Sequence, residues 1–440
     1  MQNFGCRATQ ADGAAIEQQL ESKGLRRAES ATHADIVILN TCTVTASADH
    51  DARAAVRRIH RENPDARILV TGCYAQRAPQ EVGALPGVSA VVGNSHKHLV
   101  AEMVTGTAID FVSIERLRLA SPSFTIVGDI FAHTELIAAP VIGTSEIGGK
   151  TRPNLKVQDG CDNRCSFCII PSVRGQSRSM KLERVITEAA TLVATGYREI
   201  VLSGINLGRW GRDFAPAQRF MHLLRALLEH TDVEKIRISS VEPMDWSDEL
   251  IELVSSSPRI AKHAHVPLQS GSDRILRRMH RRYRPWHYAE KVRKLREAMP
   301  DAAIGADVMV GFPGESDALF EESRSFIEHL PFTYLHVFTY SSRPGTAAAA
   351  IPDQVPVRVA RERNRILRDL AAEKNLTFRK KFLGRELNVI TLQHSGPDST
   401  EALSDNYLKV RLRGQHPPNL YVAAVAAAVQ GDELLAVAQL

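Results

Sequence analysis

Short β-branched runs alternate with helix-patterned segments along most of this chain, which restricts it to a parallel α/β architecture. In the first hundred residues, the runs ADIVILN (34–40) and ARILVTG (66–72) are bounded by turn residues. The segments before and between them have helical spacing and stop at Gly24 and Pro64. This alternation predicts a doubly wound parallel sheet, whose ligands bind at the carboxyl ends of the strands.

A second α/β series begins near residue 147. Its expected strands are NLKVQDG, REIVLSG, KIRISSVEP, HAHVPLQSG, AAIGADVMVGFPGE and YLHVFTY, with helices such as ERVITEAATLVATG between them. Repeated βα units of this number predict a barrel or part of one, with its chemistry at the carboxyl ends of the strands. Those ends carry Cys161, Ser203, Gly204, Glu242, Gln269, Ser270 and Gly311.

The end of the chain has a different pattern, with short strands such as ELNVITL and NYLKVRL between Gly and Pro turns. It predicts a small β-barrel. We therefore expect four parts: an α/β domain over 1–117, a linker over 118–146 with strand-like pieces such as FTIVGDI, a second α/β domain over 147–376, and the barrel over 377–440.

Composition restricts the setting of the protein. The sequence has no secretory leader pattern and no apolar run near 20 residues long, so we expect a cytoplasmic protein with no membrane partner. Six cysteines are too few and too widely placed for a disulfide framework, and a reducing compartment leaves them available for metal. A net charge of +5 permits a nucleic-acid partner.

Three of the cysteines occupy equivalent places in the first domain. Cys6 follows the stub QNF, Cys42 follows IVILNT and Cys73 follows ILVTG. Cysteine is often only a small buried apolar residue, but burial gives no reason for a shared position just past a strand. Because the carboxyl ends of parallel strands lie along one edge, we expect these thiols to form a single site.

The other three cysteines, Cys161, Cys165 and Cys168, lie within the loop DGCDNRCSFCIIPSVRG. Structural zinc sites close with four ligands, so three thiols leave one coordination position open. A histidine such as His263 or His265 could supply a fourth ligand for zinc, but the strand alternation there reads more simply as the wall of a cofactor pocket.

The spacing Cys161-x-x-x-Cys165-x-x-Cys168 resembles the signature of the radical S-adenosylmethionine (SAM) superfamily. The resemblance implies a 4Fe-4S cluster whose fourth iron binds SAM, with Phe167 near the adenine. It also implies a contact from Ser203 and Gly204 to the methionine amino group and a later SAM motif over 307–315. Glu242, Gln269, Ser270 and Gly311 are the further SAM-binding candidates.

The motifs NFGC, ILNTCTVT and VTGCYAQ, followed by the radical SAM loop, resemble the methylthiotransferases over nearly the whole chain. The resemblance implies that Cys6, Cys42 and Cys73 hold an auxiliary 4Fe-4S cluster that carries the transferred sulfur. Two departures are the shortened strand before Cys6, which indicates a truncated start, and Thr9, where the family commonly has asparagine.

Segments such as VLSGINLGRWG and HVFTYSSRPGTAAA resemble the branch that acts on N6-threonylcarbamoyladenosine at position 37 of tRNA. The implied reaction uses two SAM molecules: one methylates the sulfur, and the other yields a 5′-deoxyadenosyl radical that takes hydrogen from C2 of the adenine. The implied partners are the tRNA anticodon stem-loop, a low-potential electron donor and a sulfur donor. No side chain beyond the cluster ligands is expected to be catalytic.

Several alternatives remain open from the sequence. The family also has branches that act on N6-isopentenyladenosine in tRNA and on an aspartate of ribosomal protein S12. Rivals of other kinds are a non-catalytic iron-sulfur RNA-binding protein and a corrinoid-binding radical SAM enzyme, against which three strand-end thiols argue.

The C-terminal barrel resembles the TRAM domain, an RNA-binding module, although Thr391 stands where that family usually has an acidic residue. Two basic stretches, 357–381 and RILRRMHRRYRPW with Tyr283 and Trp286 interleaved, favour contact with RNA phosphates.

Overall fold

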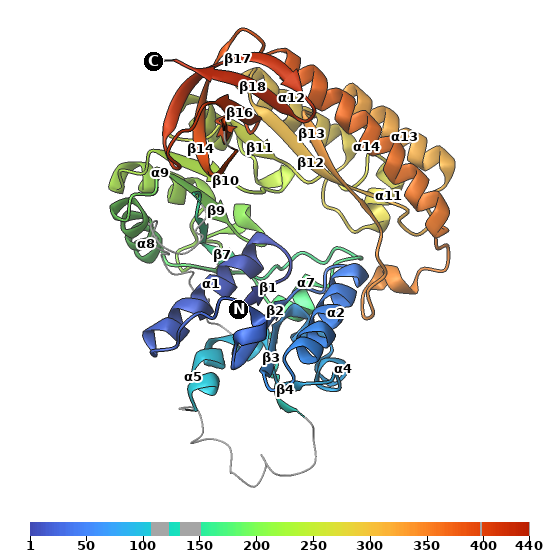
Figure 1. The fold of residues 1–440 in the computed structure, drawn as a ribbon. Coiled ribbons are helices and arrows are strands. Elements are labelled where there is room, and N and C mark those ends of the chain that lie inside the picture. Colours follow the sequence, from blue (N-terminus) through green and yellow to red (C-terminus); the bar gives the residue numbers. More distant parts are fainter. Residues whose placement is uncertain (107–122, 133–150, 397, 440) are drawn as a thin grey trace. The chain divides into compact units, whose positions relative to one another are not determined.

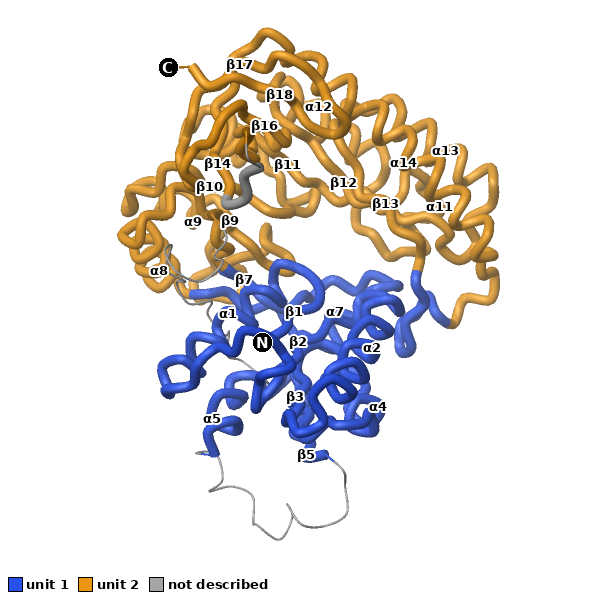
Figure 2. The backbone as a smooth tube through the Cα atoms, viewed as in Figure 1, with its two compact units in different colours: residues 1–142, 156–180, 341–349 blue, residues 143–155, 181–340, 350–440 orange. Residues whose placement is uncertain are grey.

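The computed structural model of the 440-residue chain describes residues 1–106, 123–132, 151–396 and 398–439 (Figure 1). They form two compact units, and each is built from separate stretches of the chain (Figure 2). Unit 1 contains residues 1–142, 156–180 and 341–349, and unit 2 contains residues 143–155, 181–340 and 350–440. Most of the predicted linker lies outside the described residues.

A five-stranded parallel sheet forms the centre of unit 1, in the order β1-β2-β3-β4-β5. Its strands are β1 (Gln2–Asn3), β2 (Ile36–Thr41), β3 (Arg67–Gly72), β4 (Val88–Gly93) and β5 (Phe124–Ile126). Its helices are α1 (Arg7–Ser22), η1 (Ala31–His33), α2 (Ala46–Glu62), α3 (Cys73–Arg77), α4 (Pro79–Gly83), η2 (Asn94–Leu99) and α5 (Val100–Thr105). The strand predicted within FTIVGDI is β5, so the sheet takes its fifth strand from beyond residue 117.

Helices cover both faces of this sheet, as the doubly wound prediction requires. On one face, Val37 and Val70 pack with the α2 residues Val56 and Ile59. On the other face, alternate residues of the same strands pack with α1 and α5. Helix α2 begins where the Thr45 side chain accepts a hydrogen bond from the amide of Ala48 at 3.2 Å.

Unit 1 also contains the cysteine loop of the second domain. This segment consists of β7 (Gln158–Asp159), α7 (Ile170–Arg174) and β8 (Arg178–Ser179), with β7 and β8 paired antiparallel.

Unit 2 carries the strands of the second α/β series, arranged as two three-stranded sheets, β10-β9-β6 and β11-β12-β13. The pairs β9–β10, β11–β12 and β12–β13 are parallel. The strands are β6 (Asn154–Lys156), β9 (Glu199–Ser203), β10 (Lys235–Ile238), β11 (His263–His265), β12 (Ala303–Val310) and β13 (Tyr334–Thr339). A bridge between Ile236 and Ile260 connects the two sheets. This arrangement confirms the prediction of a partial barrel.

Helices follow the strands of this partial barrel. They are α8 (Leu182–Ala194), η4 (Leu207–Arg209), α9 (Phe220–His230), η5 (Pro243–Asp245), α10 (Asp248–Ser256), α11 (Asp273–Arg278), α12 (Pro285–Ala298), α13 (Asp317–His329), η6 (Ala347–Ala350) and α14 (Val357–Lys380). Among the residues with described coordinates, none of the helices is long and apolar enough to span a bilayer.

The C-terminal strands close into the predicted small barrel, in the order β14-β15-β16-β18-β17. They are β14 (Glu386–Gly396), β15 (Ser399–Ser404), β16 (Lys409–Arg413), β17 (Tyr421–Gln430) and β18 (Glu433–Ala438). The barrel contacts the second α/β domain through Arg237, which donates to Glu199 at 2.6 Å and to the carbonyl of Asp405 at 3.1 Å. The Thr391 hydroxyl donates to the carbonyl of Pro417 at 2.7 Å, so this departure from the TRAM pattern closes a loop.

One expectation about the basic stretches is wrong in part. Tyr283 is buried and donates to the carbonyl of Leu268 at 2.5 Å, and the neighbouring Arg281 is buried and paired with Glu242. These residues belong to the core and cannot contact RNA phosphates. Trp286, in contrast, is exposed.

Candidate functional site

Cys6, Cys42 and Cys73 converge at the carboxyl edge of the unit 1 sheet. Cys6 precedes the first residue of α1, Cys42 follows β2, and Cys73 is the first residue of α3 directly after β3. Because β1, β2 and β3 are neighbours, these positions lie side by side. Burial, together with the nearby thiols Cys73 and Cys6, raises the pKa of Cys42 to about 12.

We call Cys6, Cys42 and Cys73 the strand-end trio. Two nearby groups donate hydrogen bonds to its sulfur atoms. The side-chain amide of Asn94 donates to Cys73 Sγ at 3.4 Å, and the amide of Val44 donates to Cys42 Sγ at 3.5 Å. Cys42 and Cys73 are 6% and 2% exposed, whereas Cys6 is exposed, so the trio has one open side. Buried thiols with donors aimed at sulfur fit an iron-sulfur cluster, whose sulfurs accept hydrogen bonds from the protein.

Cys161, Cys165 and Cys168 form a second trio in the loop after β7, which we call the loop trio. The amide of Cys168 donates to the carbonyl of Cys165 at 3.1 Å, and the amide of Asn163 donates to Cys161 Sγ at 3.4 Å. All three cysteines are partly buried. The loop is therefore shaped largely by nearby backbone, with one distant contact from the amide of Ala348 to the carbonyl of Ser166 at 2.8 Å. Three partly accessible thiols within eight residues fit a cluster with one position open to a ligand.

The two trios are connected through α7. Val173 and Ile169 pack against Cys73, and Asn94, which donates to Cys73, also donates to the carbonyl of Val173 at 2.7 Å. The segment that follows the loop trio thus forms part of the wall of the strand-end trio.

A buried charge cluster lies beside this connection, formed by Asp12, Lys97, Lys156, Asp159 and Arg174. Arg174 joins Asp12 at 3.0 Å and Asp159 at 2.9 Å, and it also reaches the Thr9 hydroxyl at 3.3 Å. Thr9 in turn lies 3.6 Å from Cys6 Sγ. Asp159 accepts a hydrogen bond from the amide of Gly160, directly before Cys161, at 2.8 Å.

The buried charge cluster contains three cations and two carboxylates, and a further cation, Arg178, lies 3.9 Å from Asp159, so cations outnumber carboxylates. Burial alone would raise the pKa of Asp12, but Lys156 and Lys97 hold this pKa well below its usual range. Burial alone would lower the pKa of Arg174, but Asp159, Cys73 and Asp12 raise this pKa above its usual value. An uncompensated buried cation favours an anion close by, and Cys73 and Cys6 are among the groups that raise the pKa of Arg174.

A second ionic group fixes the residues after Cys42. Asp49 pairs with Arg77 at 2.9 Å and with Arg343, and it accepts a hydrogen bond from the Thr43 hydroxyl at 2.5 Å. Arg343 comes from the segment 341–349, which returns to unit 1 from the end of the second α/β series. The segment that directly follows Cys42 is therefore held by contacts from three separate stretches of the chain.

Comparisons with known proteins show the family of this chain. Residues 1–93 match the profile described as uncharacterized protein family UPF0004, and residues 155–327 match that of the radical SAM superfamily. The chain is 38% identical to the threonylcarbamoyladenosine tRNA methylthiotransferase MtaB of Bacillus subtilis, over 93% of this chain and 89% of the relative. The MtaB of Aquifex aeolicus is 36% identical, over 94% of this chain and 96% of the relative. The chain belongs to the radical SAM methylthiotransferase family.

Two further similarities help to define the family and the fold. The tRNA-2-methylthio-N(6)-dimethylallyladenosine synthase of Thermobifida fusca is 34% identical, over 90% of this chain and 78% of the relative. The radical SAM methyltransferase TsrM from Kitasatospora setae, solved with cobalamin and a 4Fe-4S cluster, has a TM-score of 0.55 at 16% identity and covers 76% of this chain and 70% of its own. At that identity the likeness shows a shared fold.

As a radical SAM methylthiotransferase, the chain is a transferase that uses SAM and 4Fe-4S clusters. Among the predicted SAM contacts, Ser203 ends β9 and has a buried hydroxyl with no hydrogen-bond partner among the described residues. An orphaned buried hydroxyl fits a ligand contact. Gly204 follows it directly, and Phe167 lies in the cysteine loop of unit 1.

The other predicted contacts of this methylthiotransferase have partners within unit 2. Glu242 pairs with Arg281, and the Ser270 hydroxyl lies 3.0 Å from that of Ser323. Gln269 has a φ of 66° and donates its amide to the carbonyl of Asp307 at 2.8 Å, while the amide of Gly311 donates to Glu315 at 2.7 Å. Their role toward SAM stays a prediction.

Sequence reasoning missed the charged residues around the trios. Asp12 and Lys97 lie in segments that read as ordinary amphipathic helix and turn, and Arg343 lies far along the chain. The one available signal was a charged residue on an apolar helix face, as with Asp12 among Ala8, Ala11, Ala15 and Ile16.

A cavity of about 330 Å³, lined by Met1, Leu20 and Ile36, lies at the opposite, amino end of the unit 1 sheet and is lined by no cysteine.

Proposed function

We propose that this methylthiotransferase acts on tRNA and places the methylthio group on C2 of N6-threonylcarbamoyladenosine at position 37. The main support is that two three-thiol sites lie within unit 1. These two sites are connected through α7 and the buried charge cluster. The choice of substrate is supported by relatives of that name at 35% to 38% identity over at least 93% of this chain.

In this proposal the strand-end trio holds the auxiliary 4Fe-4S cluster and the loop trio holds the radical SAM cluster. When bound, these groups would supply the transferred sulfur and the electron that cleaves SAM, respectively. The chain's own residues have different tasks. Ile169 and Val173 pack over Cys73 and exclude water, and the excess positive charge near Arg174 stabilises thiolate ligands.

The remaining parts serve the substrate. Ser203 would contribute its unpaired hydroxyl to SAM, with Phe167, Gly204, Glu242, Gln269, Ser270 and Gly311 as further contacts. The C-terminal barrel and the exposed basic residues of α14 would bind the phosphates of the anticodon stem-loop, which fixes position more than sequence. We assign the protein to the cytoplasm, with a low-potential electron donor and a sulfur donor as partners. The proposed domain boundaries are 1–117, 118–146, 147–376 and 377–440, with β5 of the linker range pairing with the sheet of the first domain.

Mass spectrometry of tRNA nucleosides tests the substrate. Deletion of the gene should remove 2-methylthio-N6-threonylcarbamoyladenosine and leave its unmethylthiolated precursor, and the wild-type gene should restore the modified form. An unchanged amount in the deletion strain would overturn the proposal. Loss of the methylthiolated dimethylallyladenosine instead would assign the chain to the function in the name of its Thermobifida fusca relative.

A further inference from the structure

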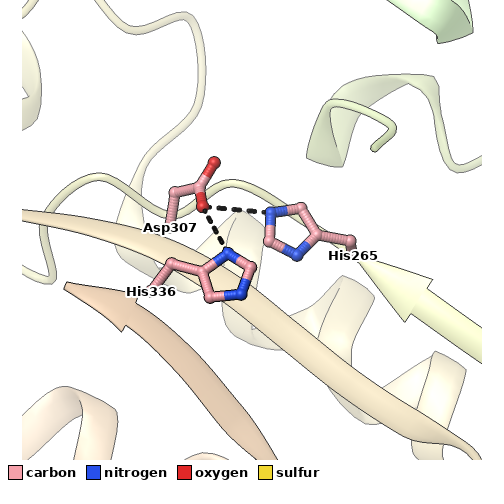
Figure 3. A group of neighbouring side chains, drawn as sticks. All are labelled: His265, Asp307 and His336. Atoms are coloured by element: carbon pink, nitrogen blue, oxygen red, sulfur yellow. Dashed lines mark hydrogen bonds and ion pairs between the residues drawn. The ribbon is translucent and has the colours of Figure 1, made fainter. Parts of the chain in front are cut away.

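Three potential metal ligands converge on one face of the β11-β12-β13 sheet in unit 2 (Figure 3). Asp307 on β12 lies directly opposite His336 on β13, and His265 on β11 lies opposite Gly305, two residues before Asp307. Because alternate residues of a strand share a face, the three side chains point to the same side. Asp307 Oδ1 lies 3.2 Å from His265 Nε2 and 3.3 Å from His336 Nδ1.

These spacings suit coordination of a metal ion. One ligand atom from each residue lies within 4.8 Å of the other two. With metal–nitrogen and metal–oxygen bonds of 2.0 to 2.1 Å, the edge of a tetrahedral site is roughly 3.3 Å. Two imidazoles and one carboxylate are a donor set that zinc and other first-row divalent metals accept with positions left open for another ligand.

The surroundings orient the deepest ligand of the three. The Nδ1 atom of His265 lies 3.0 Å from the Tyr334 hydroxyl, which itself lies 2.7 Å from His263 Nε2. The second ring nitrogen of a metal-binding histidine usually makes such a contact, which fixes the ring and directs the other nitrogen at the metal. The carbonyl of Asp307 accepts hydrogen bonds from the amides of Leu268 and Gln269, at 3.1 and 2.8 Å, which holds the backbone of this ligand.

Exposure increases across the group, from 8% for the His265 side chain through 29% for Asp307 to 52% for His336. One side is thus closed by protein, and the other gives an ion a route of entry. Among the described residues, the ion-pair partners found for Asp307 are these two histidines. Imidazole ligands bind metal in their neutral form, so the carboxylate of Asp307 would offset part of the charge of a bound cation.

We propose that His265, Asp307 and His336 form a binding site for a divalent first-row transition metal, with Zn²⁺ as its probe. The site uses no cysteine and lies apart in sequence from both trios. Its open coordination positions face the exposed side of His336, where water or an oxygen donor of a ligand would complete the shell. This proposal does not depend on the identity of the RNA substrate.

The test uses the full-length chain with both clusters reconstituted, so that the cysteines are occupied. After incubation with ZnCl₂ and gel filtration, we expect roughly one zinc ion per chain by elemental analysis. Zinc K-edge absorption should show only nitrogen and oxygen neighbours at about 2.0 to 2.1 Å, because a cysteine ligand would appear at about 2.3 Å. A shell that contains sulfur, or no retained zinc, would overturn the proposal.

Variants locate the bound ion. Asp307→Asn and His336→Gln should each reduce retained zinc to background, and the half-exposed position of His336 makes its substitution compatible with folding. Tyr334→Phe should weaken zinc affinity roughly tenfold or more, because it removes the partner of His265.

The matched control is His230→Gln, which removes a histidine from an exposed pair with Glu229 at 3.9 Å and should leave zinc unchanged. Iron content and thermal melting report the integrity of each variant. Zinc retained equally by wild type, Asp307→Asn and His336→Gln would show that the three residues only hydrogen-bond to one another and would contradict the proposal.

Discussion

The two thiol trios of unit 1 are built in opposite ways. The loop trio lies within eight residues and is shaped largely by local backbone contacts, such as the amide of Cys168 with the carbonyl of Cys165, with one distant contact from Ala348 to Ser166. The strand-end trio is spread over 68 residues, from Cys6 to Cys73, and depends on the register in which Asn3 pairs with Asn40 and Asn40 pairs with Thr71. A local site survives changes elsewhere, whereas a site assembled across strands is only as well defined as the sheet.

The largest expected effect separates the two trios by their chemistry. Cys165→Ala should abolish both SAM cleavage and methylthio transfer, because it removes a ligand of the loop trio. Cys73→Ala should abolish methylthio transfer but leave SAM cleavage, because the loop trio is intact. Anaerobic assays of 5′-deoxyadenosine and of the methylthiolated nucleoside check both results. An unchanged amount of product in Cys73→Ala would contradict the assignment of the auxiliary site.

The second-largest effect is expected when Arg174, the buried cation between the trios, is removed. Arg174→Met leaves Asp12 and Asp159 buried with one cation fewer, and loss of one partner from a buried ion pair costs about 3 to 5 kcal/mol. We expect a lower urea midpoint and less iron per chain. The exposed Arg365→Met, which removes pairs with Glu362 and Asp369, is the matched control and should change neither quantity. Equal behaviour of the two variants would show that the buried cluster does not stabilise unit 1.

The glycines before the first cysteine of each trio allow a more graded comparison. Gly5 has a φ of 115°, and a Cβ atom added there would lie 2.5 Å from the Cβ atom of Cys42. Gly160 has a φ of 71°, and a Cβ atom added there would lie 1.8 Å from the carbonyl oxygen of Gln176. Gly5→Ala should lower methylthio transfer more than SAM cleavage, and Gly160→Ala should lower both. Each should cost more than the roughly 1 to 2 kcal/mol of backbone strain alone. Gly24→Ala, which also has a positive φ but no neighbour within 4 Å, measures that strain alone.

The smallest effect is a dependence of stability on pH. The folded-state pKa of Asp12 and of Asp159 lies below the value of about 3.9 for an unfolded aspartate. The unfolded chain therefore takes up protons first as the pH falls, so the stabilisation is present above about pH 5 and is lost progressively as the pH drops through the folded-state values. Urea unfolding of the iron-free chain from about pH 6 to about pH 4 should show this slope. Asp12→Asn should flatten it, and an unaltered slope would exclude Asp12 as its source.

The sequence predicted what local pattern encodes. The strands, the partial barrel and the closed C-terminal barrel follow from hydrophobic periodicity and turn residues, and the loop trio follows from its spacing. The strand-end trio was predicted because Cys42 and Cys73 directly follow strands that could be recognised. Confirmation of the fold does not by itself test the roles of the predicted SAM contacts, which stay predictions.

The interactions that stabilise the trios were not predictable in this way. Arg174 and Asp12 are 162 residues apart, and no periodicity indicates which buried carboxylate a distant arginine will meet. The same limit explains the error at Tyr283. A run of arginines with interleaved aromatic residues is typical of an RNA-binding surface, but the turn after α11 directs Tyr283 into the core, where it bonds the backbone at Pro267 and Leu268.

The discontinuous path of the chain through unit 1 has a consequence for its synthesis on the ribosome. Asp49 pairs with Arg343, 294 residues later. At a translation rate of about 5 to 20 residues per second, the arginine is made roughly 15 to 60 s after the aspartate. During that interval the emerging N-terminal sheet has Arg77 but lacks the second guanidinium that pairs with Asp49, and until residue 174 is made it also lacks α7. The ionic group around Asp49 is therefore completed only after residue 343 has left the exit tunnel.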